Sequence, residues 1–205
     1  MLYFILKPCI QNFYHVVLLK FQFNLFGGTV LKLGTDRHHK QLLEGIDNLQ
    51  DVGCFGLTEL GYGNNAVEME TTAIYDDATK EFIVNTPHPL AQKYWITNGA
   101  IHAKHIGNFL VYCYLLTSRF SFAIYLVIFL ITNIFSIAVV FARLIVNGKN
   151  EGLHGVLVRI RDNNMKVMPG VTVEDMGHKM GLNGVDNAKL SFDQVNLYIE
   201  GYLLI

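Results

Sequence analysis

An uninterrupted apolar run limits most strongly how this chain can fold. No Asp, Glu, Lys or Arg occurs between Arg119 and Arg143, and most of the residues in Phe120–Phe141 are apolar. An uncharged stretch of roughly this length can cross the hydrocarbon core of a bilayer as one helix. Taken alone, the run therefore predicts a membrane-spanning helix over Phe120–Phe141.

Composition and charge are those of one ordinary domain and exclude several classes of partner. The 205 residues carry a formal net charge of −1 and no basic stripe, so we expect no nucleic-acid partner. The three cysteines, Cys9, Cys54 and Cys113, are far apart and form no CxxC pair, which favours a reducing compartment over a disulfide scaffold. The adjacent His38 and His39 lie in a polar, basic stretch without metal-ligand spacing, and we expect no metal site.

The periodicity of apolar residues changes along the chain from helical to strand-like. Between Phe26 and Leu49 it predicts one or two helices that end before Gly53. Beyond Gly53, short runs rich in β-branched and aromatic residues alternate with Gly, Asn and Asp, which predicts an all-β core. The predicted strands are Thr71–Tyr75 and Glu81–Asn85, joined as a hairpin, then a strand at Tyr94–Trp95, Gly155–Arg161, Gly170–Glu174 and Lys189–Val195.

Two stretches between these strands place polar backbone groups beside an apolar wall. They are Cys54–Asn65, which is rich in glycine, and Lys93–Gly99, which contains the only tryptophan. A flat amphipathic cofactor needs both an apolar surface and a few fixed donors. The spacing Gly61-x-Gly63-x-x-Ala66 also matches a dinucleotide fingerprint, but a hairpin follows it where the fingerprint requires a helix. The glycines therefore either make a tight turn or let the backbone approach a ligand.

The two stretches resemble signatures of the peroxisomal acyl-CoA oxidases. Motifs similar to those of this family occur in the same order along about two thirds of the chain. The segments and the family patterns are Leu33–His38, Cys54–Asn65 (C-F-x-x-T-E-x-G-H-G-S-N), Glu70–Asp76 (E-T-T-A-T-Y-D), Lys93–Ala100 (K-[WY]-W-I-x-x-x-A) and Asp175–Asn187 (D-x-G-x-K-x-G-x-N-G-V-D-N).

The resemblance implies an α+β fold. N-terminal helices would precede the mainly antiparallel β-barrel middle domain of acyl-CoA oxidases and dehydrogenases, interrupted by an apolar helical insert. We expect a partial N-terminal helical region over 1–52, the middle β domain over 53–105 and 137–205, and the insert over 106–136. In the family, the segments on either side of the insert are nearly continuous. A translated intron accounts for the composition of the insert, whereas a genuine segment would have to be buried or inserted in a membrane.

The resemblance also implies an activity and its site residues. Acyl-CoA oxidases are FAD-dependent oxidoreductases of peroxisomal fatty-acid β-oxidation, which convert an acyl-CoA and O2 to a 2-enoyl-CoA and hydrogen peroxide; full-length members are expected to form homodimers. Carried over by motif, Thr58, Gly63, Trp95 and Thr97 would contact the flavin, and Asn64 would lie toward the acyl-CoA substrate. Without the family, the same residues would be a strand-end threonine, a turn glycine and a core tryptophan.

The resemblance further implies that the chain is a fragment. The family's proton-abstracting carboxylate belongs to a C-terminal helical domain, and Glu59 belongs to the flavin loop, so we assign no catalytic residue and expect little turnover from the fragment alone. The final residues Leu203–Ile205 are no Ser-Lys-Leu-type address, so a peroxisomal location is expected from the family only. Two alternatives stay open: an acyl-CoA dehydrogenase, whose reduced flavin passes electrons to a carrier protein, and a non-enzymatic membrane-associated protein built on the apolar insert.

Overall fold

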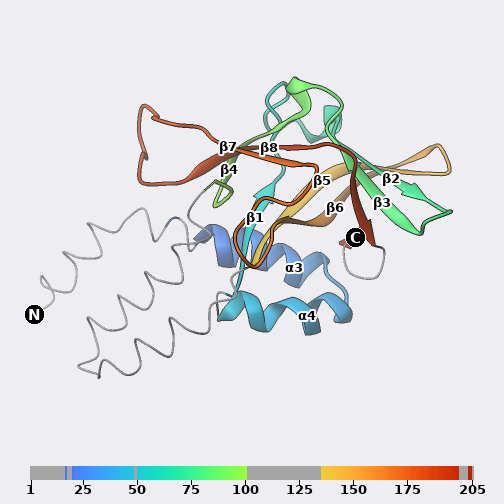
Figure 1. The fold of residues 1–205 in the computed structure, drawn as a ribbon, viewed down its shortest axis with the longest axis horizontal. Helices are drawn as coiled ribbons and strands as arrows, with labels where there is room; N and C mark the ends of the chain where they lie inside the picture. Colours follow the sequence, from blue (N-terminus) through green and yellow to red (C-terminus); the bar gives the residue numbers. More distant parts are fainter. Residues whose placement is uncertain (1–16, 18–19, 49, 101–134, 199–202, 205) are drawn as a thin grey trace, which may run out of the picture.

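The computed structural model describes residues 17, 20–48, 50–100, 135–198 and 203–204 (Figure 1). Its helices are the π-helix η1 (Phe21–Gly27), α3 (Gly28–Leu33), α4 (Asp36–Asp47) and the short 3-10 helices η2 (Ala66–Glu68) and η3 (Pro89–Ala91). Its strands are β1 (Asp51–Gly56), β2 (Thr72–Asp76), β3 (Glu81–Asn85), β4 (Lys93–Thr97), β5 (Phe135–Val146), β6 (Lys149–Arg161), β7 (Val171–Asp175), β8 (Asn187–Phe192), β9 (Val195–Tyr198) and β10 (Leu203–Leu204).

The described strands form two sheets. The larger sheet has the order β10-β6-β5-β2-β3-β9, with β1 also paired to β5, and the smaller has the order β4-β8-β7. Strands β1 and β2 run parallel to β5, and the other pairs are antiparallel. The chain passes from the smaller sheet to the larger where β8 leads directly into β9. Helices followed by a mainly antiparallel β domain agree with the predicted α+β class.

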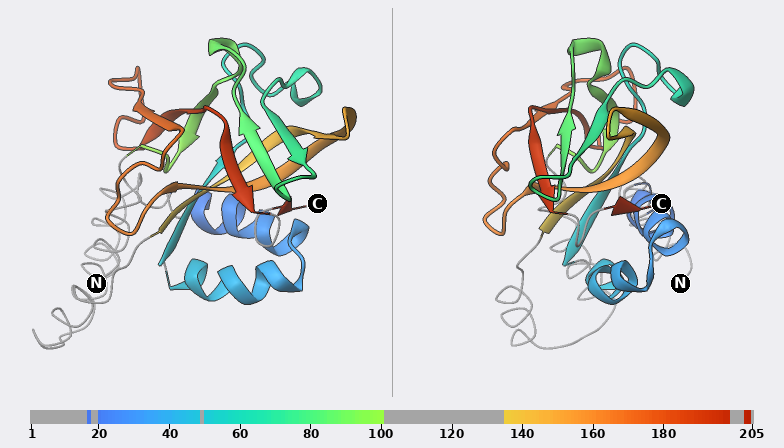
Figure 2. Two further views of the ribbon diagram at one scale, coloured as in Figure 1. Left: turned by 45° about the vertical axis from the view of Figure 1, so that its right-hand side comes forward. Right: turned by 90° about the vertical axis from the view of Figure 1, so that its right-hand side faces the viewer.

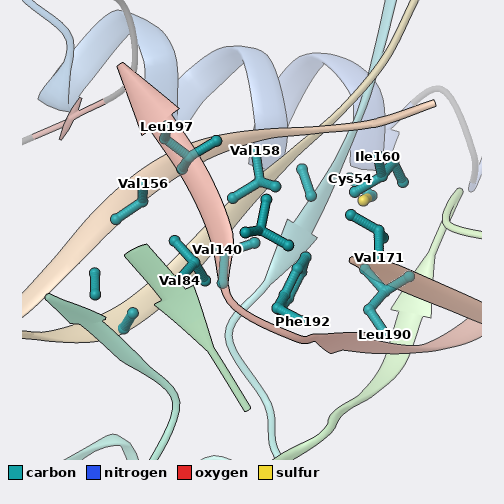
Figure 3. Close-up of a cluster of buried hydrophobic side chains, with 14 of the residues drawn as sticks. Cys54, Val84, Val140, Val156, Val158, Ile160, Val171, Leu190, Phe192 and Leu197 are labelled. Carbon is teal, nitrogen blue, oxygen red and sulfur yellow. The ribbon is translucent and has the colours of Figure 1, made fainter. Parts of the chain in front are cut away.

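One hydrophobic core lies between the two sheets. Strands β5 and β6 alternate side chains into it, and β8 closes it from the smaller sheet (Figure 3). The labelled members of this cluster are Cys54, Val84, Val140, Val156, Val158, Ile160, Val171, Leu190, Phe192 and Leu197. Because these residues come from most strands of the domain, the core fixes both sheets relative to each other.

The helices cover the opposite face of the larger sheet (Figure 2). Phe26 of η1, Val30 of α3 and Ile46 of α4 pack there against Val139 of β5 and Leu157 of β6. Strand β5 is therefore buried on both faces. Strands covered on both faces consist of nearly continuous apolar residues, which explains the absence of charge from this part of the sequence.

This burial corrects the predicted helix over Phe120–Phe141. From Phe135 onward the run forms strand β5, so a single membrane-spanning helix over the whole range is wrong. The predicted insert over 106–136 likewise ends inside β5, and its residues 106–134 lie outside the described residues. Among the residues that the structure describes, no helix is both long enough and apolar enough to cross a membrane.

The predicted helices and hairpin are confirmed, and two strands differ from the prediction elsewhere. Helices α3 and α4 occupy the predicted helical region, but β1 begins at Asp51, ahead of Gly53. Strands β2 and β3 form the predicted hairpin. The single strand predicted over Lys189–Val195 is instead divided between β8 and β9, because Gln194 has a left-handed φ of 48° that ends the extended conformation.

Helix η1 is attached to β1 by a buried amide and an aromatic ring. The Gln22 Nε2 group donates to the Asp51 carbonyl at 2.7 Å, and Gln22 Oε1 accepts from the Gly53 N–H at 2.7 Å. The Phe26 ring lies against Gly53, where a Cβ atom would come within 2.0 Å of the ring. Glycine at this position therefore permits the close approach of helix and strand.

Candidate functional site

The first glycine-rich stretch begins in β1 and continues, from Leu57 to Asn65, in the long loop between β1 and β2. Both strands pair with the same edge of β5, one after the other, so the chain leaves this edge after Gly56 and returns to it at Thr72. The intervening loop lies beside the segment before β4 at the top of Figure 1. The Leu60 N–H donates to the Gln92 carbonyl at 3.0 Å, and the Gly61 N–H donates to the Leu90 carbonyl at 2.8 Å.

The carboxylate of Glu59 closes the base of this loop. It accepts hydrogen bonds from the Glu70 N–H at 2.9 Å, the Thr71 N–H at 3.0 Å and the Thr71 hydroxyl at 2.6 Å. Its ionic partner is the Lys93 ammonium of β4, at 3.0 Å, and the side chains of the pair are 1% and 0% exposed. These contacts join the start of the loop, at Glu59, to its end, at Glu70 and Thr71. Through Lys93 they also hold both parts against β4.

Burial and pairing act on this ion pair in opposite directions. Burial raises the pKa of Glu59, but Lys93 and the hydrogen bonds from Thr71 and Glu70 outweigh that effect, so the pKa lies below its ordinary value. Burial lowers the pKa of Lys93 to about 8, against the opposing attraction of Glu59. Both groups are therefore mainly charged at neutral pH, and the loop is closed by an ion pair.

Arg143 of β5 supports the remainder of the loop. Its Nη2 atom donates to the carbonyls of Val67 at 2.8 Å and Met69 at 2.9 Å. Gly63, near the loop tip, has a left-handed φ of 57°, and its N–H donates to the Glu59 carbonyl at 2.7 Å. Glycine adopts this conformation without steric cost, so the turn is tight without strain.

Four of the five predicted site residues line one open hollow of about 530 Å³. Thr58, Gly63 and Asn64 come from the loop, and Trp95 comes from β4. The Thr58 hydroxyl donates to the Tyr94 carbonyl, and the Tyr94 N–H donates back to the Thr58 carbonyl at 3.0 Å. The two predicted stretches are thus joined directly. The hydroxyl proton of Thr58 is used within the chain, but its oxygen retains the capacity to accept a hydrogen bond.

Trp95 lies at an irregularity of β4 that leaves its side chain exposed. The pairing of β4 with β8 shifts register between Lys93 and Ile96, and Trp95 has a left-handed φ of 63°. A bulky residue in this conformation stores about 1–3 kcal/mol of strain, which is typical of functional sites. Trp95 is 54% exposed, and its ring meets the Tyr94 ring at 90° with centroids 6.0 Å apart. The interpretation of Trp95 as a core residue is therefore wrong.

A second hollow, of about 380 Å³ and largely apolar, shares Trp95 with the first. The fifth predicted residue, Thr97, lies here with Met180 and Asn187. The Asn187 Nδ2 group donates to Thr97 Oγ1 at 3.1 Å and so orients the threonine hydroxyl. Thr58 and Thr97 therefore line two neighbouring hollows. Trp95 belongs to both hollows and joins them into one surface.

Several residues of the site were not predicted individually. Asn187 and Lys179 lie in the second hollow, and the Lys179 ammonium donates to the Val185 carbonyl at 2.9 Å. The signal for both was present, because they belong to the motif-matching segment Asp175–Asn187. The pairing of Glu59 with Lys93 had no such signal, since the two residues are 34 positions apart.

The chemistry of this surface suits a planar amphipathic ligand. An exposed indole offers an apolar face, two threonine oxygens offer polar contacts, and the glycine turn lets backbone approach closely. The buried carboxylate at the site, Glu59, is occupied by its four donors. Within the described part of the chain, no group of three or more His, Cys, Asp or Glu side chains is arranged to hold a metal ion.

Relatives of known name match most of this chain but only a short part of themselves. Acyl-coenzyme A oxidase 3, peroxisomal, of Arabidopsis thaliana is 36% identical over 181 residues, which are 88% of this chain and 22% of the relative. Acyl-coenzyme A oxidase 2, peroxisomal, of the same plant is 38% identical over 183 residues, 86% of this chain and 22% of the relative. No family model matches the chain.

Solved structures give the same result for the fold. Acyl-CoA oxidase 1 of Arabidopsis thaliana superposes with a TM-score of 0.71 at 30% identity, covering 91% of this chain and 24% of that protein. Acyl-CoA oxidase-2 of Caenorhabditis elegans, bound with FAD, ascaroside-CoA and ATP, superposes with a TM-score of 0.73 at 28% identity, covering 94% and 24%. The chain belongs to the acyl-CoA oxidase family and spans about a quarter or less of the length of these members.

Proposed function

We propose that this chain forms the flavin-facing wall of an FAD-dependent acyl-CoA oxidase of fatty-acid β-oxidation, with a fatty acyl-CoA and O2 as substrates. The exposed, strained Trp95, shared by two hollows, is the observation that carries this proposal. The names of the relatives support the reaction class, and one related structure is described as bound with FAD and ascaroside-CoA. When bound, FAD would supply the acceptor for the hydride that leaves the acyl chain.

Each predicted residue has a distinct role in this proposal. Trp95 supplies the apolar surface and excludes water from one side of the ligand. Thr97, held by Asn187, and Thr58, held by Tyr94, present oxygens whose hydrogen-bond directions are already set. Gly63 and its neighbour Asn64 form the rim of the first hollow, where Asn64 would meet the acyl-CoA side.

The proposal places proton abstraction outside the described residues. Glu59 is buried in an ion pair with Lys93 and accepts hydrogen bonds from Thr71 and Glu70, and the lowered pKa of its carboxyl makes it a poor base for the α-proton of a substrate. We therefore expect the 205-residue chain by itself to release little hydrogen peroxide from acyl-CoA, in a peroxidase-coupled assay. Peroxide release at ordinary enzyme rates would contradict this.

The wider assignments rest on the family. We propose a peroxisomal location, following the names of the Arabidopsis relatives, and a homodimer for the full-length enzyme. We further propose that the middle β domain comprises 53–105 and 137–205, after a partial N-terminal helical region over 1–52, and that 106–136 is a translated intron. Comparison of the spliced transcript with the gene tests the last point, because an abundant transcript that retains this segment would exclude it.

Flavin binding can be measured directly, since Trp95 is the only tryptophan. We expect FAD to quench its fluorescence saturably, after correction for absorbance with free tryptophan. Thr97→Val is expected to weaken binding about tenfold, because it removes the oriented oxygen. The control Thr79→Val alters an exposed turn between β2 and β3 and is expected to bind as the unmodified chain does. Linear, unsaturable quenching, or equal effects of the two variants, would overturn the proposal.

A further inference from the structure

The two walls of the first hollow come from distant segments that must be held in register. The loop wall follows β1, and the other wall is β4 with Trp95. Main-chain hydrogen bonds and the Thr58 hydroxyl connect the walls near the solvent. The buried connection beneath them is the ion pair of Glu59 and Lys93.

Both residues of the pair lie close to predicted site residues in the chain. Glu59 directly follows Thr58, and Lys93 lies two positions before Trp95, at the residue where the pairing of β4 with β8 shifts register. A strained φ such as that of Trp95 persists only where the surrounding contacts over-determine it. Lys93 anchors the strand on one side of the strained residue, and Asn187, paired opposite Thr97, anchors it on the other.

Breaking the pair would disturb its immediate surroundings, because both side chains are buried. Loss of either charge leaves the other buried without compensation, which is strongly unfavourable. Loss of the carboxylate also leaves the N–H groups of Glu70 and Thr71 competing for fewer acceptors, and these N–H groups close the loop. The relaxation would therefore begin in the loop and at the Trp95 bulge, while the β5–β6 core keeps its own contacts.

We propose that Glu59 and Lys93 are positioning residues of the cofactor site: their ion pair holds the Thr58–Asn64 loop against the Trp95 bulge and thereby sets the affinity for the flavin. The side chains of the pair are buried, and the pair acts through the two walls. The part that concerns affinity rests on the proposed function, whereas the part that concerns geometry does not.

The test uses Glu59→Gln, Lys93→Met and the double variant, in which no uncompensated buried charge is left. Phe26→Leu is the matched control, since it destabilises the helix-covered face of the sheet and lies outside both hollows. Hydrogen exchange is measured by mass spectrometry without any ligand. We expect exchange about tenfold faster in 57–71 and 90–98, with 153–160 unchanged, in the three pair variants but not in Phe26→Leu. Uniformly faster exchange, or none, would overturn the inference.

Flavin titration supplies the second measurement. In the pair variants, including the double variant, we expect FAD affinity to fall about tenfold, whereas Phe26→Leu keeps it within about twofold despite its lower stability. The proposal is refuted if FAD affinity simply falls with the free energy of unfolding across all four variants, because the pair would then contribute only to stability. If the unmodified chain fails to bind FAD, the proposed function fails, and hydrogen exchange alone still decides whether the pair positions the two walls.

Discussion

Replacing Gly53 with alanine tests how the helices are attached to the β domain. A Cβ atom at this position would lie 2.0, 2.1 and 2.3 Å from the Cδ1, Cγ and Cδ2 atoms of Phe26. Carbon atoms in contact are normally about 3.5–4.0 Å apart. The ring is fully buried and packs in one cluster with Val30 and Ile46. Either Phe26 or the whole of η1 must therefore move away from β1.

The expected cost follows from this displacement. Overpacking of a core costs about 1–3 kcal/mol, and complete loss of a buried phenylalanine's packing costs about 3–5 kcal/mol. Movement of η1 would also lengthen the hydrogen bond from the Gly53 N–H to Gln22, which is 2.7 Å long. We expect Gly53→Ala to lower the free energy of unfolding by about 2–4 kcal/mol.

Urea unfolding followed by circular dichroism measures this change, with two controls. Gly181→Ala introduces a Cβ atom with nothing within 4 Å and should alter stability by less than about 0.5 kcal/mol. In a Phe26→Ala background the clash is absent, so most of the cost of Gly53→Ala should disappear. Additive effects of the two substitutions, or a cost no larger than that of Gly181→Ala, would refute the packing argument.

Four further predictions follow from single residues. Burial raises the pKa of Cys54 to about 12, so iodoacetamide at pH 8 should alkylate its peptide at least about a hundredfold more slowly in the folded than in the unfolded chain. Arg143→Met removes three hydrogen bonds to the carbonyls of Val67 and Met69 and should speed limited proteolysis within 57–71. Gly63→Ala has free space for its Cβ, so thermal unfolding should reveal only the cost of its positive φ, about 1–2 kcal/mol. The folded state lowers the pKa of Glu59 from 4.5. The stabilising contribution of the ionised carboxylate is therefore complete above pH 4.5 and is lost as the pH falls through the lowered pKa. The fall in the free energy of unfolding on acid titration should be correspondingly smaller in Glu59→Gln.

Local sequence patterns were sufficient for the elements whose conformation is decided by near neighbours. The hairpin of β2 and β3 was predicted because alternating strand-forming residues flank a polar turn, and both signals lie within the hairpin itself. The helical region was predicted from the spacing of its apolar residues, one face of which does pack on the sheet. The end of β8 was missed because a left-handed φ is uncommon for glutamine, so the residue type of Gln194 does not indicate it.

The apolar run shows where a local pattern is ambiguous. A membrane-spanning helix and a strand covered on both faces share one requirement, which is that no side chain meets water. The sequence from Phe135 to Phe141 satisfies both. The strand is selected by β1 and β6, which pair with its two edges, and by η1 and α3, which cover one face. None of these partners can be identified from the run itself.

The sequence by itself determined that helices precede a set of short strands, the family and, through its motifs, the five residues assigned to the site. Those properties are carried by residue types and short spacings. The tertiary structure alone decided that Thr58, Gly63, Asn64 and Trp95 share one hollow, that Trp95 is exposed in a strained conformation, and that Glu59 pairs with Lys93 beneath it. These features depend on contacts between segments far apart in the chain, because the energy of a buried ion pair or a strained backbone is set by what surrounds it.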